Sequence, residues 1–339
     1  MAAPKLLDIR GQRLENEGYV IRYQRIRNRS MSWLWSLFRF VLILGIGFII
    51  IRPILQQISV AFKSPEDIYN PTIYMIPVHF TLENIKNALD ILNYWPLLRN
   101  TLLFVVSTTL MATASCALAG YGFARFEFPG RNILFACVIL TILIPASTLM
   151  VPMYLHFRNF DVFNLVTLFT GREGLNLLNT YWPSIIMAAF GVGLKSGLYI
   201  YIFRQFFRGL PKEIEEAALI DGAGGIRTFL TIMLPNSIPP IITVLLFSFV
   251  WQYNDTFYAS LFMNNSELMA NAVAALPANA NQRLPRLLGI EGTEVRADPN
   301  HVAMIVDTGV LLSIAPLIIL YLFVQRYFVE SVERTGIVG

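Results

Sequence analysis

The sequence predicts an all-α, polytopic membrane protein with six transmembrane helices and, between the fourth and the fifth, a cytoplasmic loop of two short helices. Three observations support this fold class. Of the 339 residues, 55% are hydrophobic and only 14% are charged, which is more apolar surface than a soluble core can hide. Apolar windows of about 20 residues, long enough to cross the hydrocarbon core of a bilayer, recur along the chain. Basic residues crowd the segments on one side of those windows.

The apolar windows define six predicted spans. They cover residues 36–60, 101–124, 132–155, 182–206, 238–262 and 303–325. The first follows a long polar leader and is interrupted by Arg39 and Arg52. We therefore expect it to be a retained helix rather than a cleaved signal peptide.

The Lys and Arg residues beside the spans predict which side each connection faces. With the N-terminus in the cytoplasm, fifteen of these residues fall in inside segments and eight in outside loops. The positive-inside rule then places the arm 1–35, the loop 207–237 and the tail 326–339, and so both termini, in the cytoplasm. It places the connections 61–100 and 263–302 outside.

Two spans carry features that affect packing. On the second, small side chains recur every four residues: Ala112, Cys116, Gly120 and Ala124. Such a stripe lets another helix approach closely. That helix belongs either to this chain, which is the commoner arrangement, or to a second subunit. On the third span, Pro145 and Pro152 each remove a backbone donor, so we expect a bent helix.

The loop 207–237 has the signals of two amphipathic helices. Pro211 stands at a first helical position, acidic residues follow where they favour the helix dipole, and Gly222 suits the end of a short helix. A second helix should then present one apolar stripe: Ile226, Phe229, Leu230 and Met233. Leu234-Pro235 ends it, and the fifth span begins.

A pair of helices lying on the membrane surface would show the same period. Such a pair would favour Lys and Arg toward anionic lipid, whereas residues 212–221 hold one basic and four acidic side chains. Ala217 and Ala218 lie on the same face as Ile214 and are too small to hold another surface away. Docking on a protein with basic side chains explains these features better.

Several other classes of protein are not supported. Cys116 and Cys137 both lie in apolar runs, and the three histidines have no ligand-like spacing, so neither a disulfide framework nor a metal site is supported. No basic stripe interleaved with aromatic residues suggests a nucleic acid partner. A secondary carrier should show inverted repeats, and an intramembrane enzyme should show paired acidic, histidine or nucleophilic groups. We find neither pattern.

Ionisable side chains within spans are expensive and are candidates for function. These are Arg52, Lys195 and Asp307, with an interior ion pair as the alternative role. Lys195 is placed near the middle of the fourth span. In the fifth span, a ring that could stack on a sugar stands beside polar groups that could hold hydroxyls: Trp251, Tyr253, Asn254 and Asp255. We take these five residues, Lys195 included, as a possible substrate path.

The loop also carries a motif. Glu216-Ala217-Ala218, three residues, Gly222, nine residues and Ile232-Met233-Leu234-Pro235 resemble the loop through which membrane subunits of ATP-binding-cassette (ABC) importers bind a separate ATPase. Other segments resemble the sugar branch of these permeases: residues 98–101, 120–131, 204–207, 251–255 and 325–328. Together they cover most of residues 95–339, and the chain is most similar to the six-helix partner in maltose-type, oligosaccharide-importing permease pairs.

The resemblance implies a transport subunit, not an enzyme, in the cytoplasmic membrane of a bacterium or archaeon. Its implied partners are a second permease subunit, an extracytoplasmic solute-binding protein that delivers sugar, and an ATPase dimer that uses ATP and Mg²⁺. No phosphate-binding loop occurs in the chain, and we expect it to bind no cofactor itself.

The same resemblance implies roles for the motif residues. Glu216 would pair with a cation of the ATPase, and Gly222 would form the turn between the coupling helices. The remaining coupling positions are Ala217, Ala218, Ile232, Leu234 and Pro235. The stretch 330–339 would reach toward the ATPase interface.

Two segments depart from the family pattern. Residues 1–32 form a basic leader that is longer than usual, which we expect to be a solvated or headgroup-associated arm. The connection 263–302 is rich in Asn, Ala and Pro and shows no regular period, so we expect an extracytoplasmic loop. This loop either contacts a large or unusual binding protein or is a connection without a binding role.

Overall fold

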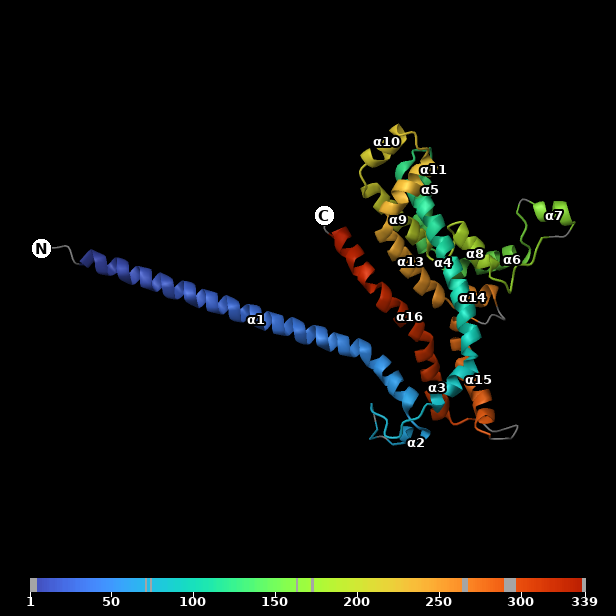
Figure 1. Ribbon diagram of the computed structural model, residues 1–339, viewed down its shortest axis with the longest axis horizontal. Helices are drawn as coiled ribbons and strands as arrows, with labels where there is room; N and C mark the ends of the chain where they lie inside the picture. The colour runs from blue at the N-terminus through green and yellow to red at the C-terminus, as the bar shows by residue number, and fades with distance from the viewer. Residues whose placement is uncertain are drawn as a thin grey trace.

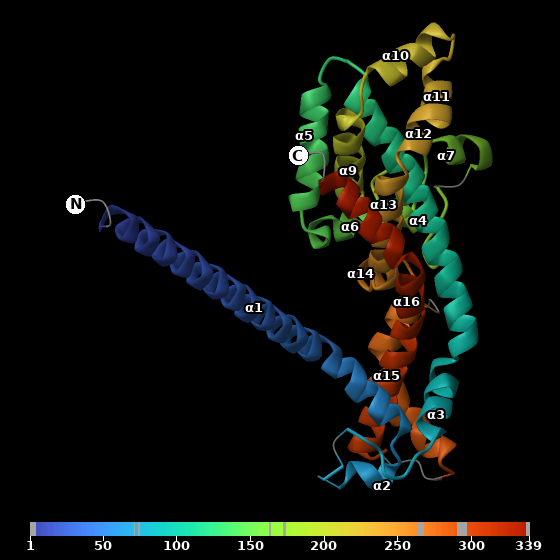
Figure 2. The same cartoon turned by 60° about the vertical axis from the view of Figure 1, so that its left-hand side comes forward.

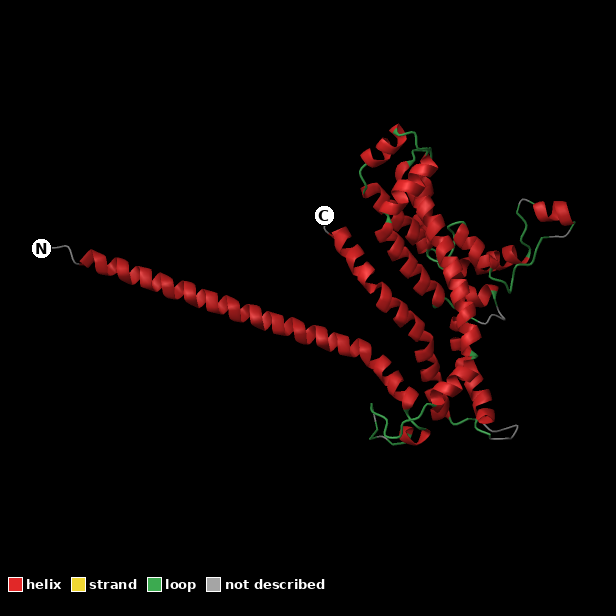
Figure 3. Ribbon diagram, viewed as in Figure 1, coloured by secondary structure: helices red, strands yellow, loops and turns green. Residues whose placement is uncertain are grey.

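The computed structural model describes residues 5–70, 72–73, 75–162, 164–171, 174–263, 268–289 and 297–336, and helices dominate it (Figure 3). These residues form no strand, only isolated bridges between Lys63 and Phe80 and between Phe160 and Leu175. The helices are α1 (Lys5–Phe62), α2 (Pro65–Ile68), α3 (Glu83–Leu92), α4 (Tyr94–Arg125), α5 (Arg131–Leu143), a 3₁₀ turn (Ala146–Leu149), α6 (Met150–Arg158), α7 (Leu165–Thr170), α8 (Trp182–Ala189), α9 (Ser196–Gly209), α10 (Glu213–Ile220), α11 (Gly225–Thr228), a π-helical turn (Phe229–Met233), α12 (Leu234–Asn236), α13 (Ile238–Tyr253), α14 (Phe257–Phe262), α15 (Met269–Leu287) and α16 (Pro299–Gly336).

The long helix α4 organises the bundle. It packs along α9, α13 and α8, and its buried face is lined with small and hydroxyl-bearing side chains such as Thr108, Ala112 and Cys116. Figures 1 and 2 show α10 at one end of this bundle and α2 at the other. Because α4 runs the whole length between them, it fixes how the two ends are placed relative to one another.

The small-residue stripe of the second predicted span packs within this chain. A Cβ atom added to Gly120 would lie 2.5 Å from Cβ of Phe203 and 3.0 Å from the backbone nitrogen of Arg204. Cys116 is fully buried and its Sγ donates to the carbonyl of Ser196, 3.7 Å away. The stripe therefore packs against α9 of the same chain. Of the two expected arrangements, packing within the chain is the one observed.

Three described helices are long and apolar enough to cross a membrane, namely Met31–Phe62, Tyr94–Arg125 and Pro299–Tyr327. The expectation of one bent helix over 132–155 needs correction, because Arg131–Leu143 and Ala146–Arg158 meet at 104°. Pro145 lies at that break, as the missing backbone donor predicts, whereas Pro152 lies inside α6.

The fourth and fifth predicted spans are also interrupted. Residues 182–206 divide into α8 and α9, separated at 190–195, where Gly191 and Lys195 adopt positive φ angles of 68° and 59°. Residues 238–262 divide into α13 and α14, separated at 254–256. Hydropathy missed both interruptions because the broken segments are as apolar as continuous helices.

The predicted connections contain more helix than expected. The segment 263–302 holds α15, whose buried residues Leu276, Ala280 and Leu284 recur at helical spacing and pack toward α16 and α3. Pro277 and Pro285 inside α15 concealed that period. Residues 264–267 and 290–296 of this connection lie outside the described residues.

The two ends of the chain are helical as well. The arm 1–35 is not separate from the first span, because α1 continues from Lys5 through Phe62; residues 1–4 lie outside the described part. In Figures 1 and 2, α1 extends away from the bundle and meets it only near its C-terminal end, against α16 and α3. The sixth span, 303–325, lies inside α16, which continues to Gly336. The end of the tail, 337–339, is outside the described residues.

Between α1 and α3, the chain folds around a buried carboxylate. Asp67 is 1% exposed, and it accepts hydrogen bonds from the backbone N–H groups of Val78 (2.8 Å) and His79 (2.9 Å) and contacts Nδ1 of His79 at 2.7 Å. Burial acts to raise the pKa of Asp67, but the hydrogen bonds outweigh it and the pKa lies below 3.8. The hydrogen bond to Asp67 and its charge raise the pKa of His79 above 6.5.

We expect Gly120→Ala to destabilise the subunit by about 1–3 kcal/mol, because the methyl group overlaps atoms of α9 that cannot move without separating the helices. Gly122→Ala is the matched control, since its added Cβ meets no atom within 4 Å. The measurement is denaturant unfolding of the purified subunit in detergent. Equal stability of the two variants would show that the close contact with α9 is not needed.

We expect the 63–82 segment to be most stable at mildly acid pH. The His79 contribution is complete below its unfolded pKa of 6.5 and is lost as pH rises through its higher folded value. The Asp67 contribution is complete above 3.8 and is lost as pH falls through its lower folded value. Hydrogen exchange at the Val78 and His79 amides, corrected for intrinsic rates, should show greatest protection in this window. His79→Gln should remove the decline on the alkaline side, and a flat wild-type profile would contradict the assignment.

Candidate functional site

The segment 207–237 forms two helices at one end of the bundle. α10 ends at Ile220, and Gly222 follows with φ +82°, a left-handed conformation that glycine adopts without steric cost. Its N–H donates to the carbonyl of Leu219 at 3.1 Å, and the next N–H donates to Ala218 at 3.0 Å. The first helix and its glycine end are confirmed. The second helix also has the expected extent, because α11, the π turn and α12 run from Gly225 to Asn236 before a bend of 80° into α13.

The inner face of this segment packs on α4 and α9. Ala218, Phe229 and Met233 are 4%, 6% and 0% exposed. The Phe229 ring centroid lies 5.0 Å from that of Tyr121 on α4 and 6.3 Å from that of Phe207 on α9. These aromatic contacts join the loop to α4 and α9, at the ends of these two helices that are expected to face the cytoplasm.

A polar contact beside these rings fixes the start of α10. The Tyr121 hydroxyl donates to Oε1 of Glu215 at 2.5 Å, and Nε of Arg125 lies 3.4 Å from Oε2 of the same carboxylate. Nη2 of Arg125 donates to the carbonyl of Leu210 at 2.8 Å. We call Tyr121, Arg125 and Glu215 the anchor. Because its donors come from α4, the anchor ties the start of α10 to that helix.

Sequence reasoning missed the role of Glu215. Three glutamates stand in the first turn of α10, and only the geometry shows which one turns inward. The available signal was spacing: Glu215 and the buried Ala218 are three residues apart and share a helix face. Tyr121 and Arg125 likewise share a face of α4, four residues apart.

The outer face is exposed and largely apolar. Glu216, Ala217 and Gly222 are all exposed. Ile220 is 85% exposed and Ile226 is 78% exposed, with Leu219 and Leu230 each about half exposed. The expected stripe of the second helix is therefore divided, with Phe229 and Met233 inside and Ile226 and Leu230 outside. We call Glu216, Ala217, Ile220 and Ile226 the outer surface.

The last motif residues form the stem of the loop. Leu234 packs against the aromatic cluster, Ile232 is half-buried, and Pro235 is exposed at the start of α12. Ser237 ends that helix with its hydroxyl donating to the Leu234 carbonyl at 2.7 Å. Ile232, Leu234 and Pro235 thus set the bend between the loop and α13, and they lie apart from the outer surface.

The structure brings together two residues of the expected substrate path. Nζ of Lys195 lies 4.3 Å from the centroid of the Trp251 ring, although Lys195 stands in the break before α9 rather than inside a helix. Asn254, one turn beyond Trp251 at the end of α13, is exposed.

The other two residues of that path turn away from it. Tyr253 is 3% exposed and its hydroxyl donates to the carbonyl of Ser313 at 2.7 Å. Asp255 accepts a hydrogen bond from the Tyr258 N–H at 3.1 Å, which caps α14. Both side chains are thus engaged by hydrogen bonds within the chain. Of the remaining ionisable residues in the spans, Arg52 is exposed on α1 and Asp307 is half-buried on α16.

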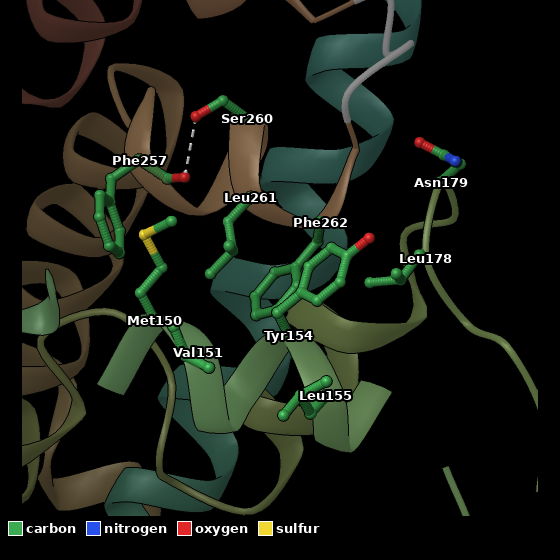
Figure 4. A pocket seen from close by; sticks show the side chains of 10 residues that line it. All are labelled: Met150, Val151, Tyr154, Leu155, Leu178, Asn179, Phe257, Ser260, Leu261 and Phe262. Atoms are coloured by element: carbon green, nitrogen blue, oxygen red, sulfur yellow. Dashed lines mark hydrogen bonds between the residues drawn. The ribbon is translucent and has the colours of Figure 1, made fainter. Parts of the chain in front are cut away.

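An open cavity of about 600 Å³ lies between α6 and α14 (Figure 4). Its wall is mostly apolar, with polar atoms from Tyr154, Asn179 and Ser260. The Ser260 hydroxyl is already engaged by the backbone carbonyls of Thr256 (2.6 Å) and Phe257 (3.1 Å). None of the path residues expected from the sequence lines this cavity, so it does not extend the Lys195–Trp251 pair.

The chain is similar to permeases over most of its length. A probable ABC transporter permease protein of Pyrococcus horikoshii is 29% identical over 292 residues, which are 85% of this chain and 92% of the relative. The arabinooligosaccharides transport system permease protein of Halalkalibacterium halodurans is 27% identical, over 91% of this chain and 97% of that protein. The diacetylchitobiose uptake system permease protein of Streptomyces coelicolor is 28% identical, over 84% and 83%.

A solved structure shares the fold. It is the crystal structure of a bacterial ABC transporter involved in the import of the acidic polysaccharide alginate, which matches with a TM-score of 0.69 and 20% identity over 87% of this chain and 96% of that chain. The model of the family described as binding-protein-dependent transport system inner membrane component matches residues 114–334. This match includes the C-terminal part of α4, the anchor, the Glu216-Ala217-Ala218 motif and most of α16. It shows that the chain belongs to that family of inner-membrane transport subunits and is not an enzyme.

Proposed function

We propose that this chain is one of two permease subunits of an ATP-driven, binding-protein-dependent importer of sugars or oligosaccharides. Family membership supports the import role, and the names of the arabinooligosaccharide and diacetylchitobiose relatives support the substrate class. An extracytoplasmic solute-binding protein delivers the sugar, and a second permease completes the translocation path. ATP and Mg²⁺ are bound by a separate ATPase dimer, while this chain binds no cofactor.

The loop 207–237 is the proposed docking element for the ATPase. The observation that carries this proposal is the contrast between its two faces. The inner face is held by the anchor and by buried Phe229, whereas the outer surface exposes Ile220 and Ile226 almost fully. Exposed apolar patches rimmed by polar groups are typical of protein interfaces. Glu216 beside this patch supplies the carboxylate for a basic group of the ATPase, and Gly222 supplies the turn.

We propose six membrane crossings with the loop and both termini in the cytoplasm. The excess of basic residues in 1–35, 207–237 and 326–339 supports this orientation. α8 and α9 together make the fourth crossing, and the bent pair α5 and α6 makes the third. Interrupted helices are tolerated at membrane depth where neighbouring protein or water satisfies the freed backbone groups. Here α4 packs against both α8 and α9.

We expect Glu216→Lys to leave the subunit folded and to reduce sugar uptake at least tenfold, because the reversed charge opposes a basic site on the ATPase. A tenfold loss corresponds to about 1.4 kcal/mol of docking free energy. The measurements are uptake in cells and ATPase retained by the purified permease pair.

Glu213→Lys makes the same charge change on the same helix outside the motif, at another exposed position, and should retain most activity. If Glu216→Lys transports at the wild-type rate at equal protein level, the docking role is wrong. If both variants lose activity equally, the effect reflects the net charge of α10 rather than Glu216.

We expect a cysteine at Ile226 to be labelled by an impermeant maleimide only after the cells are permeabilised and the ATPase is removed. Ile226 is suited to this test because it is 78% exposed, whereas its neighbour Thr228 is fully buried. A cysteine at Ile76, which is 80% exposed at the other end of the bundle, should be labelled on intact cells. Cys137 is exposed and must first be replaced, while Cys116 is buried. Labelling of Ile226→Cys on intact cells would reverse the proposed orientation.

A further inference from the structure

Lys195 has a backbone conformation that few residues other than glycine adopt. It stands just before α9 with φ 59° and ψ 15°, a left-handed conformation that is uncommon for a lysine. Its ammonium group lies 4.3 Å from the centroid of the Trp251 ring, which is within the range of a cation–π interaction. The backbone break and the aromatic contact together hold the cation at one place on the surface of the bundle.

That place lies beside the membrane-spanning helix α4. The carbonyl of the residue after Lys195 accepts from Cys116, which lies in the apolar stretch of α4, beyond its middle. On α13, Ser248 donates to the hydroxyl of Thr109, midway along α4, at 3.4 Å, and Trp251 follows one turn later. A charged group at this depth faces protein or a water-filled path rather than lipid.

The cation is not neutralised by the described residues. Their ion pairs join Asp67 to His79 and Glu215 to Arg125, and Asp255 is engaged by the N–H of Tyr258. Lys195 is exposed, as are Trp251, at 46%, and Asn254. The hydroxyl of Ser196, at the first position of α9, is buried without a hydrogen-bond partner. The first turn of α9 adds the positive end of a helix dipole to the same place.

We propose that Lys195 and Trp251 form a binding element for the anionic group of a saccharide, either a carboxylate of a uronic acid or a phosphate ester. The proposal rests on the proposed function, since it names the class of sugar that the importer carries. The ammonium group pairs with the anion, and the exposed part of the Trp251 ring contacts the sugar. The Asn254 amide nitrogen donates to the Val250 carbonyl at 2.9 Å, which leaves its oxygen to accept from a sugar hydroxyl. A neutral sugar would leave the cation without an ionic partner among the described residues.

The test uses the assembled transporter, with companion permease and ATPase, in lipid nanodiscs. Equilibrium dialysis measures the binding of two matched pairs of probes. Trigalacturonate is compared with its methyl ester, which has the same rings without the charges, and maltose 6′-phosphate is compared with maltose. The variants are Lys195→Met, which removes the charge at similar volume, and Lys195→Arg, which keeps it.

We expect the wild type to bind one charged probe at least tenfold more tightly than its uncharged partner. Lys195→Met should abolish that difference, while Lys195→Arg should retain most of it. The pair that shows the difference identifies the anion as carboxylate or phosphate. No preference for charge in either pair, or a preference that survives in Lys195→Met, would overturn the proposal. So would loss of the companion permease from the Lys195→Met complex, because the lysine would then serve subunit contact.

Uptake by complete proteoliposomes containing the binding protein separates this proposal from the function on which it rests. ATP-dependent uptake of neutral sugars without charge preference would reject the anion site and keep the importer assignment. Absence of ATP-dependent uptake of every saccharide tested would reject the sugar-import function itself.

Discussion

The close approach of α4 and α9 at Gly120 is the contact on which the arrangement of this protein depends. In a bilayer, apolar side chains gain little by leaving lipid for protein, so helix association relies on close packing. Gly120 and the fully buried Cys116 supply that packing because they let the α9 backbone come within van der Waals contact of α4. With the two axes fixed, Tyr121 and Arg125 reach the carboxylate of Glu215 and the carbonyl of Leu210.

The anchor then separates the two faces of the loop 207–237. One acidic side chain of α10 is held by a phenol and a guanidinium of the bundle, and the next one along the chain is exposed. The Glu215 carboxylate is bound by side chains of the same chain. The position of α10 is therefore fixed before any partner binds. Preorganisation of this kind lowers the entropic cost of association. The exposed residues Ile220 and Ile226 are then presented on a rigid support.

The sequence predicted the class of fold and the two helices of the loop 207–237 because both depend on local signals. Hydropathy identified the apolar segments, and Pro211 and Gly222 marked the ends of α10. The interruptions at 190–195 and 254–256 could not be predicted, because backbone geometry breaks these helices without changing their hydropathy. The choice between Glu215 and Glu216 also depended on tertiary contact, since the residues are adjacent and chemically identical. α15 was missed because Pro277 and Pro285 weaken a period that is visible only once Leu276, Ala280 and Leu284 are known to be buried.

The helix α9 connects the loop 207–237 to the proposed binding element at Lys195 and Trp251. Lys195 immediately precedes its first residue, and Leu210, whose carbonyl accepts the hydrogen bond from Arg125, immediately follows its last. A helix of 14 residues spans about 21 Å and is stiff along its axis over that length. The small residues of α4 hold it along one side, and Thr141 of α5 lies against Gly197 near its beginning. A displacement of the loop that moves Leu210 along the axis therefore moves Lys195 with it. Because the lysine stands at a break in the backbone, that movement would change its position relative to Trp251 on α13. Under the proposed function, α9 would thereby carry a force from the loop to the proposed binding element.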